Sequence, residues 1–240
     1  MLLPAHSTAQ PNRRRTEPSK VQGLGSARAA IWRGLRRGVR RVARTSIPDW
    51  VAKNRVVSAE SGSPFPGPWK HSRAPHLVEM MEVCALDDPC TEVVNKKSAQ
   101  TAGTEWLINV ALYFLAVLKA AVLYVLPTKD VINLFTQTKL DPSIDASKAV
   151  KAVVLPRKSR DAKGSTARFR KVRGGGYLVL AGANVSKHLK MYSAQITIRD
   201  EVTEFPWDVD KQGEPNSLID KRDLAFRKIG YKRLYNSTPD

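Results

Sequence analysis

The sequence predicts an α/β fold in which helices flank a mostly parallel central sheet, and three features carry this prediction. Short apolar runs typical of strands alternate along the chain with segments of helical periodicity. The run Val122–Leu126 is continuously apolar, as buried central strands of parallel sheets are. Polar stretches at Asn95–Glu105 and at Asp200-Glu201 directly follow apolar strands, and open α/β sheets bind ligands at the carboxyl ends of their strands.

Length and composition limit the domain organisation. The chain has 240 residues, of which 42% are hydrophobic, so it can form one large domain or two small ones. Its formal net charge of +18 favours a polyanionic partner such as nucleic acid. Residues 1–45 hold 11 Lys and Arg residues and a single acid, Glu17. We therefore expect a disordered basic arm over residues 1–45 and a folded domain over residues 46–240.

Within the arm, residues 27–43 have the pattern of a basic amphipathic helix. Ile31, Leu35, Val39 and Val42 recur at helical spacing. The other face carries arginines that we expect to contact DNA: Arg33, Arg36, Arg37, Arg40, Arg41 and Arg44. The same pattern would suit an anionic membrane surface, a partner protein, or a helix packed on the domain with solvated arginines.

Cysteine and histidine spacing gives no sign of a structural zinc. The two cysteines and four dispersed histidines form neither C-x-x-C nor H-x-x-x-H. The low cysteine count suits a reducing cytosol, and the N-terminus lacks the apolar segment of a secretory signal. Its Arg-rich, acid-poor character also resembles an organellar transit peptide, which stays an alternative.

The folded domain is expected to begin with two short helices. Pro48 and Asp49 favour a first helical turn, and that helix would run through Asn54. A turn-rich loop over residues 61–69 follows, and then a helix over Leu77–Leu86.

The apolar stretch over residues 107–126 is long enough to span a bilayer. Asn109 and Lys119 interrupt it. We expect instead a buried helix up to about Val117, a turn near Lys119 and the strand Val122–Leu126, with a transmembrane helix as the alternative.

The C-terminal half continues the alternation. Helices are expected over Lys129–Lys139 and Asp223–Lys228. Strands are expected over Ala149–Leu155, Ala167–Val172, Tyr177–Leu180, Ala194–Arg199 and Tyr231–Tyr235.

The stretch Val93–Glu105 reads as a strand, a turn of small and polar residues, and the start of a helix. These are the parts of a phosphate-binding loop, where backbone N–H groups and the helix dipole favour an anion. The usual pattern G-x-x-x-x-G-K-[ST] is altered, because Ala102 stands at the glycine position and Gly103 at the lysine position. The nearby lysines, Lys96 and Lys97, lie at the front of the loop.

ATP hydrolysis requires a phosphate cradle, a cation, a hydroxyl and an Asp for Mg²⁺, and a carboxylate that activates water. The chain can supply these parts from the backbone of residues 98–104 and from Lys97, Thr104, Asp200 and Glu201. The alternative is that Asp200-Glu201 forms only a solvated turn.

From about Trp50 to its last residue, the sequence resembles the ATPase domain of the lambda-type phage terminase large subunit family. No single segment is specific, but the ordered set over about 190 residues is. Its members are Gly67-Pro68-Trp69, Arg73-Ala74-Pro75, Lys97-Ser98-Ala99-Gln100, Thr104-Glu105, Leu126-Pro127-Thr128, Lys158-Ser159-Arg160-Asp161, Leu180-Ala181-Gly182-Ala183-Asn184, Asp200-Glu201-Val202, Phe205-Pro206, Ser217-Leu218, Lys221-Arg222 and Ser237-Thr238-Pro239.

The resemblance implies a P-loop NTPase core of the ASCE, RecA-like type. Its activity would be that of an ATP-driven motor that packages double-stranded viral DNA into procapsids. The cofactors would be ATP and Mg²⁺, with Lys97 serving the phosphates and Glu201 acting as catalytic base. Thr104 would hold the metal and Asp200 its water shell.

The resemblance also implies further site residues and partners. An aromatic residue, Phe65 or Trp69, would stack on adenine. The nucleotide-binding loop would comprise Lys97, Ser98, Ala99, Gln100, Thr101, Ala102, Gly103 and Thr104, and coupling of hydrolysis to movement would involve Ser237, Thr238 and Pro239. Expected partners are double-stranded DNA, the terminase small subunit, the portal and procapsid, and further copies of the chain, in the bacterial host cytoplasm and without a membrane.

Several departures from the family pattern bear on activity. The Cβ of Ala102 is unfavourable if the loop requires a positive φ there, and Gly103→Lys should raise activity if the loop is degenerate. The strand before Asp200 carries Gln195, Thr197 and Arg199, where a buried strand is expected. The chain ends where the ATPase core ends, so we expect a truncated protein without nuclease activity. The alternative is a non-catalytic DNA-binding or assembly protein derived from a terminase.

Overall fold

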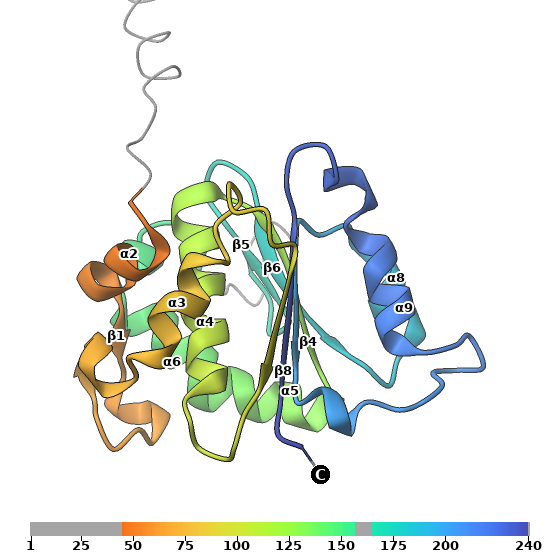
Figure 1. Ribbon diagram of the computed structural model, residues 1–240, viewed down its shortest axis with the longest axis horizontal. Coiled ribbons are helices and arrows are strands. Elements are labelled where there is room, and N and C mark those ends of the chain that lie inside the picture. Colours follow the sequence, from red (N-terminus) through yellow and green to blue (C-terminus); the bar gives the residue numbers. More distant parts are fainter. Residues whose placement is uncertain (1–44, 157–164, 240) are drawn as a thin grey trace, which may run out of the picture. The chain divides into compact units, whose positions relative to one another are not determined.

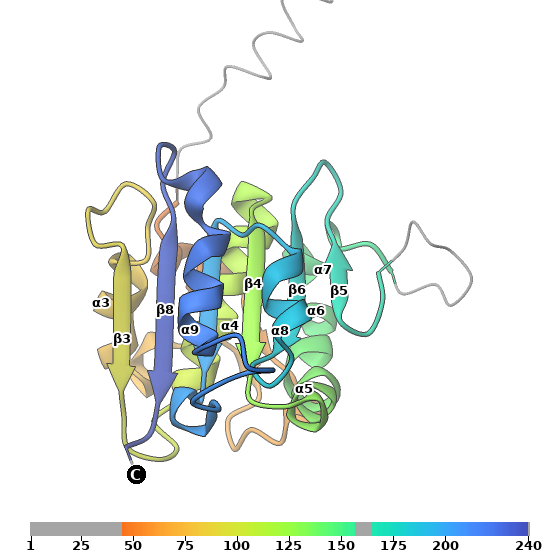
Figure 2. The same cartoon turned by 90° about the vertical axis from the view of Figure 1, so that its right-hand side faces the viewer.

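The computed structural model describes residues 45–156 and 165–239, which form an α/β body (Figure 1). Its six-stranded sheet consists of β3 (Glu92–Lys96), β4 (Ala121–Leu126), β5 (Phe169–Lys171), β6 (Tyr177–Gly182), β7 (Ile196–Asp200) and β8 (Lys232–Ser237). Their order across the sheet is β3-β8-β7-β4-β6-β5 (Figure 2). Only β5 runs antiparallel to its neighbour, so the predicted mostly parallel sheet is confirmed.

Helices cover both faces of this sheet. They are α2 (Ile47–Asn54), α3 (His76–Glu82), α4 (Gly103–Tyr113), α5 (Lys129–Phe135), α6 (Asp141–Ala146), α7 (Lys148–Lys151), α8 (Ser186–Met191) and α9 (Pro215–Ile219). Helices α2, α3, α4 and α6 lie on one face, and α8 and α9 lie on the other (Figures 1 and 2). A two-stranded ribbon, β1 (Val56–Val57) and β2 (Gly67–Pro68), adjoins the first group.

The strand β4 joins the two hydrophobic cores because its side chains alternate between the faces of the sheet. Tyr124 packs with α4 residues such as Trp106 and Leu107, all of them fully buried. Val125 packs in a second cluster with Leu189 of α8 and Ile219 of α9. The sheet is therefore covered on both faces, as expected for parallel strands.

The apolar stretch over residues 107–126 folds as predicted. Helix α4 continues through one wide turn, Phe114–Leu118, and Lys119 adopts a left-handed conformation with φ of 53°. The chain then enters β4. Within the described ranges, no helix is both long and apolar enough to cross a membrane.

The strand predicted over Ala149–Leu155 is wrong. Its first half forms α7, whose N–H groups bond to the carbonyls of Ser147 and Lys148. Only Val154 bridges to Val172, beside β5. The predicted helix over Asp223–Lys228 is reduced to one 3₁₀ turn, Leu224–Phe226.

The polar residues of β7 are compatible with burial because they have partners. Thr197 and Arg199 are both 0% exposed. The Arg199 guanidinium donates to Asp220 and lies 4.4 Å from the ring centroid of Tyr235. A buried strand is thus formed despite its arginine, since the charge is paired. The arm arginines lie outside the described residues, and the boundary at residue 45/46 stays a prediction.

Candidate nucleotide-binding site

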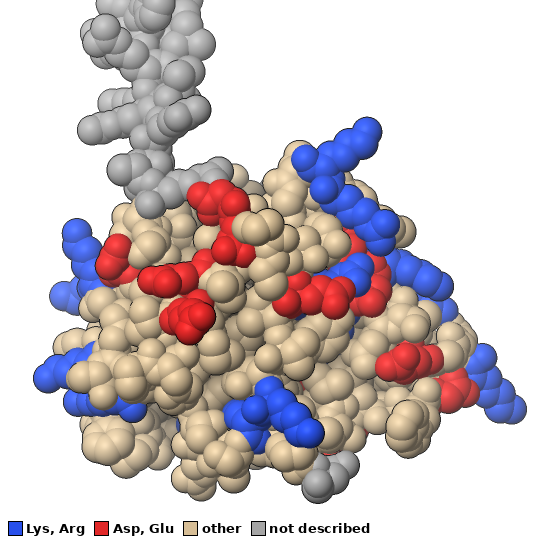
Figure 3. Space-filling view, viewed as in Figure 1, with Lys and Arg blue, Asp and Glu red and all other residues tan. Residues whose placement is uncertain are grey.

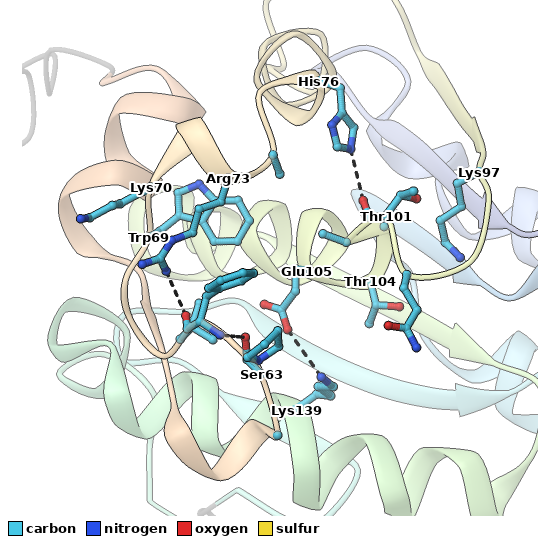
Figure 4. Close-up of a pocket in the computed structure, with 18 of the residues that line it drawn as sticks. Ser63, Trp69, Lys70, Arg73, His76, Lys97, Thr101, Thr104, Glu105 and Lys139 are labelled. Atoms are coloured by element: carbon cyan, nitrogen blue, oxygen red, sulfur yellow. Dashed lines mark hydrogen bonds and ion pairs between the residues drawn. The ribbon is translucent and has the colours of Figure 1, made fainter.

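A pocket of about 580 Å³ lies where the carboxyl ends of the strands meet the N-terminus of α4 (Figure 4). Its walls come from residues within two segments, 62–76 and 97–105, together with Val57, Lys139 and Glu201. The strand ends that approach it belong to β3, β8 and β7, which are neighbours in the sheet. The position agrees with the expectation that ligands bind at the carboxyl ends of parallel strands.

The loop between β3 and α4 contains two side-chain-bearing residues in left-handed conformations. Gln100 has φ of 60° and Ala102 has φ of 61°. This conformation costs an L-residue roughly 1–2 kcal/mol. Ala102 is the N-cap of α4 and provides no side-chain hydrogen bond, so the N–H groups of the first helical turn have no side-chain cap. Such a turn, with its positive dipole end, suits an anion.

Gly103 is required by the packing around it. A Cβ at this position would lie 2.3 Å from Asn236 Oδ1 and 2.5 Å from Lys97 Cδ. The aliphatic chain of Lys97 therefore occupies the space that a side chain at residue 103 would need. The expectation that Gly103→Lys raises activity if the loop is degenerate stays a prediction, and a side chain at residue 103 would first have to displace Lys97 and buried Asn236.

The front lysine of the loop reaches the acidic pair. Lys97 Nζ lies 3.5 Å from Glu201 Oε1, with side-chain exposures of 9% and 35%. The Thr238 hydroxyl donates to the other oxygen of Glu201, also at 3.5 Å. Glu201 has φ of 55°, so the chain turns sharply just after β7. Both oxygens of the predicted base thus have partners on neighbouring elements.

Asp200 is held in the interior beside this pair. It is 2% exposed, and its two oxygens accept hydrogen bonds from Asn236 Nδ2 at 2.6 Å and from the Tyr124 hydroxyl at 2.8 Å. Burial raises the pKa of Asp200, whereas the hydrogen bonds from Asn236, Tyr124 and Thr104 oppose this rise. The Thr104 hydroxyl, predicted to hold the metal, therefore lies near enough to the predicted metal-binding carboxylate to lower its pKa.

Residues Asp200 and Thr104 fit a magnesium ion. The described ranges contain no group of three or more His, Cys, Asp or Glu side chains that could hold a metal. Mg²⁺ does not need such a group, since it is usually bound through one or two carboxylates together with phosphates and water. A buried carboxylate next to a hydroxyl, at the edge of an anion-binding turn, meets this requirement.

The predicted coupling residues contact the loop after β7. Ser237 Oγ accepts a hydrogen bond from the Thr203 amide at 3.1 Å and lies 2.8 Å from the Thr203 hydroxyl. Thr238 contacts Glu201 as described above, and Pro239 is exposed. The end of β8 is therefore bonded to the segment that carries the acidic pair.

The two aromatic residues predicted for adenine differ in accessibility. Both line the pocket. Trp69 is 9% exposed, and its Nε1 donates to His71 Nδ1 at 3.2 Å. Phe65 is 58% exposed, and the Arg73 guanidinium lies 5.2 Å from its ring centroid. Phe65 is thus the more available of the two for a base, while Trp69 belongs to the core.

Ser98 and Ala99 lie exposed at the start of the loop, outside the set of residues that line the pocket. The remaining loop residues predicted to bind nucleotide line it: Lys97, Gln100, Thr101, Ala102, Gly103 and Thr104.

The sequence did not indicate the charged group behind the loop. Arg55, 1% exposed, donates to Glu105 Oε2 at 2.8 Å and to Asn109 Oδ1 at 3.0 Å. Lys139 Nζ approaches the other oxygen of Glu105 at 4.0 Å from across the pocket (Figure 4). Arg55 and Lys139 are far from the loop in sequence and carry no motif, so only the fold brings them together.

Comparison with known proteins identifies the family. The family described as "Phage terminase large subunit gpA, ATPase domain" matches residues 63–240. The chain belongs to this family. The terminase resemblance noted in the sequence is thereby confirmed, and the ATPase-domain family implies ATP binding and hydrolysis in general.

Two curated relatives are terminase large subunits. That of Enterobacteria phage P21 is 31% identical over 92% of this chain and 33% of its own length. That of Escherichia phage lambda is 28% identical over 86% of this chain and 31% of its own length. This chain thus spans about a third of the relatives it matches.

A solved terminase has the same fold. The HK97 bacteriophage large terminase superposes with a TM-score of 0.59 at 10% identity, covering 80% of this chain and 37% of that chain. At this identity the likeness concerns the fold alone. It agrees with the predicted α/β fold with a mostly parallel central sheet.

Proposed function

We propose that this terminase-family chain binds ATP with Mg²⁺ and hydrolyses it to drive DNA packaging. The observation that carries the proposal is the approach of Lys97 to Glu201 in one pocket beside the N-terminus of α4, with the buried Asp200 directly before Glu201. A cradle, a cation, a metal-binding carboxylate and a second carboxylate are the parts that phosphoryl transfer to water needs.

Each residue has a distinct role in the proposed reaction. The first-turn N–H groups of α4 and the Lys97 ammonium bind the phosphates. Asp200 and Thr104 hold the Mg²⁺, which would neutralise phosphate charge when bound. Glu201 accepts the proton of the attacking water, and Phe65 stacks on adenine. Ser237 bonds to Thr203 and Thr238 bonds to Glu201. These two residues would transmit a change at Glu201 to β8.

The altered loop is compatible with this proposal. Gly103 leaves space for the side chain of Lys97. Lys97, at the front of the loop, would thus bind the phosphates in place of a lysine at the usual position. Ala102 adopts the left-handed conformation that the turn needs, at an energetic cost but without blocking the turn.

Measurement of ATP hydrolysis with and without Mg²⁺ and double-stranded DNA tests the proposal. The wild type should hydrolyse ATP only with Mg²⁺. Glu201→Gln should bind ATP with near wild-type affinity yet lose at least about 100-fold in turnover, because a general base typically contributes 10²–10⁴-fold. Glu204→Gln, a nearby exposed acid, is the matched control. Equal turnover by Glu201→Gln and wild type would contradict the assignment of the base.

A second candidate is a DNA-binding or assembly protein without catalysis, which the basic composition of residues 1–45 favours. Acidic side chains gather over the upper middle of the face seen in Figure 3, with most Lys and Arg side chains near its margins and one group below the middle. We assign the main DNA contact to the arm arginines, because residues 1–45 carry +10 of the +18 net charge. ATP-independent DNA binding by a wild type that binds no nucleotide would favour this candidate. The small subunit, the portal and procapsid, and further copies of this chain are the partners we propose for the motor, acting in the host cytoplasm.

A further inference from the structure

A continuous row of hydrogen-bonded polar side chains, buried except for the half-buried Asn95, crosses four neighbouring strands at the pocket edge of the sheet. Asn95 of β3 donates to Asn236 of β8 through Nδ2 and Oδ1 at 2.9 Å. Asn236 Nδ2 donates to Asp200 Oδ1 of β7 at 2.6 Å, and the Tyr124 hydroxyl of β4 donates to Asp200 Oδ2 at 2.8 Å. The strand order β3-β8-β7-β4 makes this row possible.

The register explains why Asn236 is the centre of the row. In the sheet it is paired with Asn95 on one side and with Asp200 on the other. It is 0% exposed, as is Tyr124, and Asp200 is 2% exposed. A buried polar group without a partner costs about 1–3 kcal/mol. Loss of any hydrogen bond between the buried members of the row would therefore lower the stability of the fold.

The row fixes the direction of the Asp200 carboxylate. Each of its oxygens has a donor on a different adjacent strand, so rotation of the carboxylate would break two hydrogen bonds at once. The Tyr124 hydroxyl is the donor in its bond to Asp200 Oδ2, so it holds this oxygen from the β4 side of the sheet. The remaining lone pairs of the Asp200 oxygens stay available to Thr104 and to a ligand in the pocket.

The packing of Gly103 gives independent support. A Cβ at residue 103 would meet Asn236 Oδ1 at 2.3 Å, so the start of α4 lies against the same amide that holds Asp200. Asn236 thus contacts the phosphate-binding turn on one side and the predicted metal-binding carboxylate on the other. It also directly precedes Ser237 and Thr238, which bond to the loop after β7.

We propose that Asn236 and Tyr124 are positioning residues that hold the Asp200 carboxylate in the one orientation suited to the Mg²⁺ of a bound nucleotide. This inference rests on the proposed function. Residues that orient a metal-binding side chain typically contribute 10–100-fold to metal affinity or activity. Asn236 and Tyr124 would act only through Asp200 and would not touch the nucleotide.

The test measures how ATP binding depends on the concentration of Mg²⁺, by titration calorimetry on the full chain. Tyr124→Phe and Asn236→Ala are compared with wild type, and ATP binding in the presence of EDTA is measured for each. Tyr177→Phe is the matched control, because it also removes one hydroxyl from a strand of this sheet, but its partner is the Ser193 carbonyl. Thermal melting checks that each variant is folded, and Tyr124→Phe keeps the test informative if Asn236→Ala does not fold.

We expect both variants to raise the half-saturating Mg²⁺ concentration at least about 10-fold. Affinity for ATP in EDTA and the behaviour of Tyr177→Phe should match wild type. A wild type whose ATP binding responds to Mg²⁺, with folded variants that respond identically, would overturn this inference alone. A wild type that shows no Mg²⁺-dependent ATP binding would overturn the proposed function and this inference together.

Discussion

Asp200 is a buried carboxylate, and its surroundings shift its pKa in opposite directions. Burial raises its pKa, and the negative charge of Glu201 acts in the same direction. Hydrogen bonds from Asn236, Tyr124 and Thr104 favour the ionised form. The balance is a raised pKa, so the folded state holds this charge at a cost to stability.

Asp200→Asn should remove Mg²⁺-dependent ATP binding, and its stability relative to wild type should rise with pH. Because the folded-state pKa is raised, the wild type loses stability as the pH rises from the ordinary value of about 3.9 to the raised value. The stability of the variant relative to wild type should therefore be lowest below this window, rise through it and then stay constant. Denaturation from pH 3 to 8 measures it, with about 2–4 °C in Tm for each kcal/mol. A stability difference between the two proteins that does not change with pH would contradict the burial argument.

Ala102→Gly should raise the free energy of unfolding by roughly 0.5–1 kcal/mol. Glycine relieves the left-handed strain at φ of 61°, which outweighs the entropy it adds to the unfolded chain. Ala99→Gly, in the same loop but without a positive φ, is the control and should not stabilise. Urea denaturation of both variants decides the point. Equal effects of the two substitutions would show that the loop is not strained at Ala102.

At the level of single residues, motifs predicted the side chains with proposed chemical roles but not the residues that hold them in place. Lys97, Asp200 and Glu201 stand in recognisable positions after strands, and the structure brings them together. Asn236 and Tyr124 carry no such signal, because their importance depends on the register of non-consecutive strands.

Among the elements, β8 lies between β3 and β7 and joins the loop strand to the acidic strand. Its first residue, Lys232, is 1% exposed, and its ammonium donates to the carbonyls of Val83 at 2.8 Å, Asp88 at 3.0 Å and Cys90. This lysine ties the start of β8 to the segment between α3 and β3. The position of Asn236 at the far end of the strand depends on this attachment.

Lys232→Met should lower the free energy of unfolding by roughly 3 kcal/mol. The substitution keeps the chain length but leaves three partly buried carbonyls without this donor, each costing on the order of 1 kcal/mol. Lys228→Met, at an exposed position, is the matched control and should change stability by less than about 0.5 kcal/mol. Chemical denaturation of both variants provides the measurement. A loss in Lys232→Met no larger than in the control would contradict this role for the ammonium.

Elements with strong patterns were predictable, and short ones were not. The buried helix and strand within residues 107–126 were correct because a long apolar run with an interruption at Lys119 admits few folds. The segment Ala149–Leu155 has β-branched residues, yet hydrogen bonds to Ser147 make half of it helical. The short helices α8 and α9 were missed, since tertiary packing on the sheet rather than local periodicity forms them.

At the scale of the whole molecule, more than half of the net positive charge and the candidate nucleotide-binding site lie in different parts of the chain. The arm, residues 1–45, carries +10 of the +18 net charge, whereas the pocket lies in the described body. The domain boundary and the composition of the arm predict that the arm and the body bind different ligands. Nucleotide binding should need only the body, and DNA affinity should depend on the arm.

Deletion of residues 1–45 should weaken binding to double-stranded DNA and flatten its dependence on salt. Each lost phosphate contact reduces the slope of log K against log salt by about 0.9, so loss of the six arm arginines would change it by up to about 5. Fluorescence anisotropy with labelled DNA from 50 to 300 mM salt measures the slope. An unchanged slope would show that DNA is bound elsewhere on the chain.

The most direct test of the account is the affinity for ATP with Mg²⁺ of wild type, Lys97→Ala and Lys96→Ala, measured by fluorescence with a labelled ATP analogue. Lys97 lies beside Glu201 in the pocket, whereas its neighbour Lys96 is exposed on β3. We predict that Lys97→Ala weakens binding at least about 10-fold, as loss of a charged hydrogen bond should, and that Lys96→Ala binds like wild type. Equal affinity of Lys97→Ala and wild type, or no ATP binding by the wild type, would contradict the assignment of this pocket as a nucleotide site.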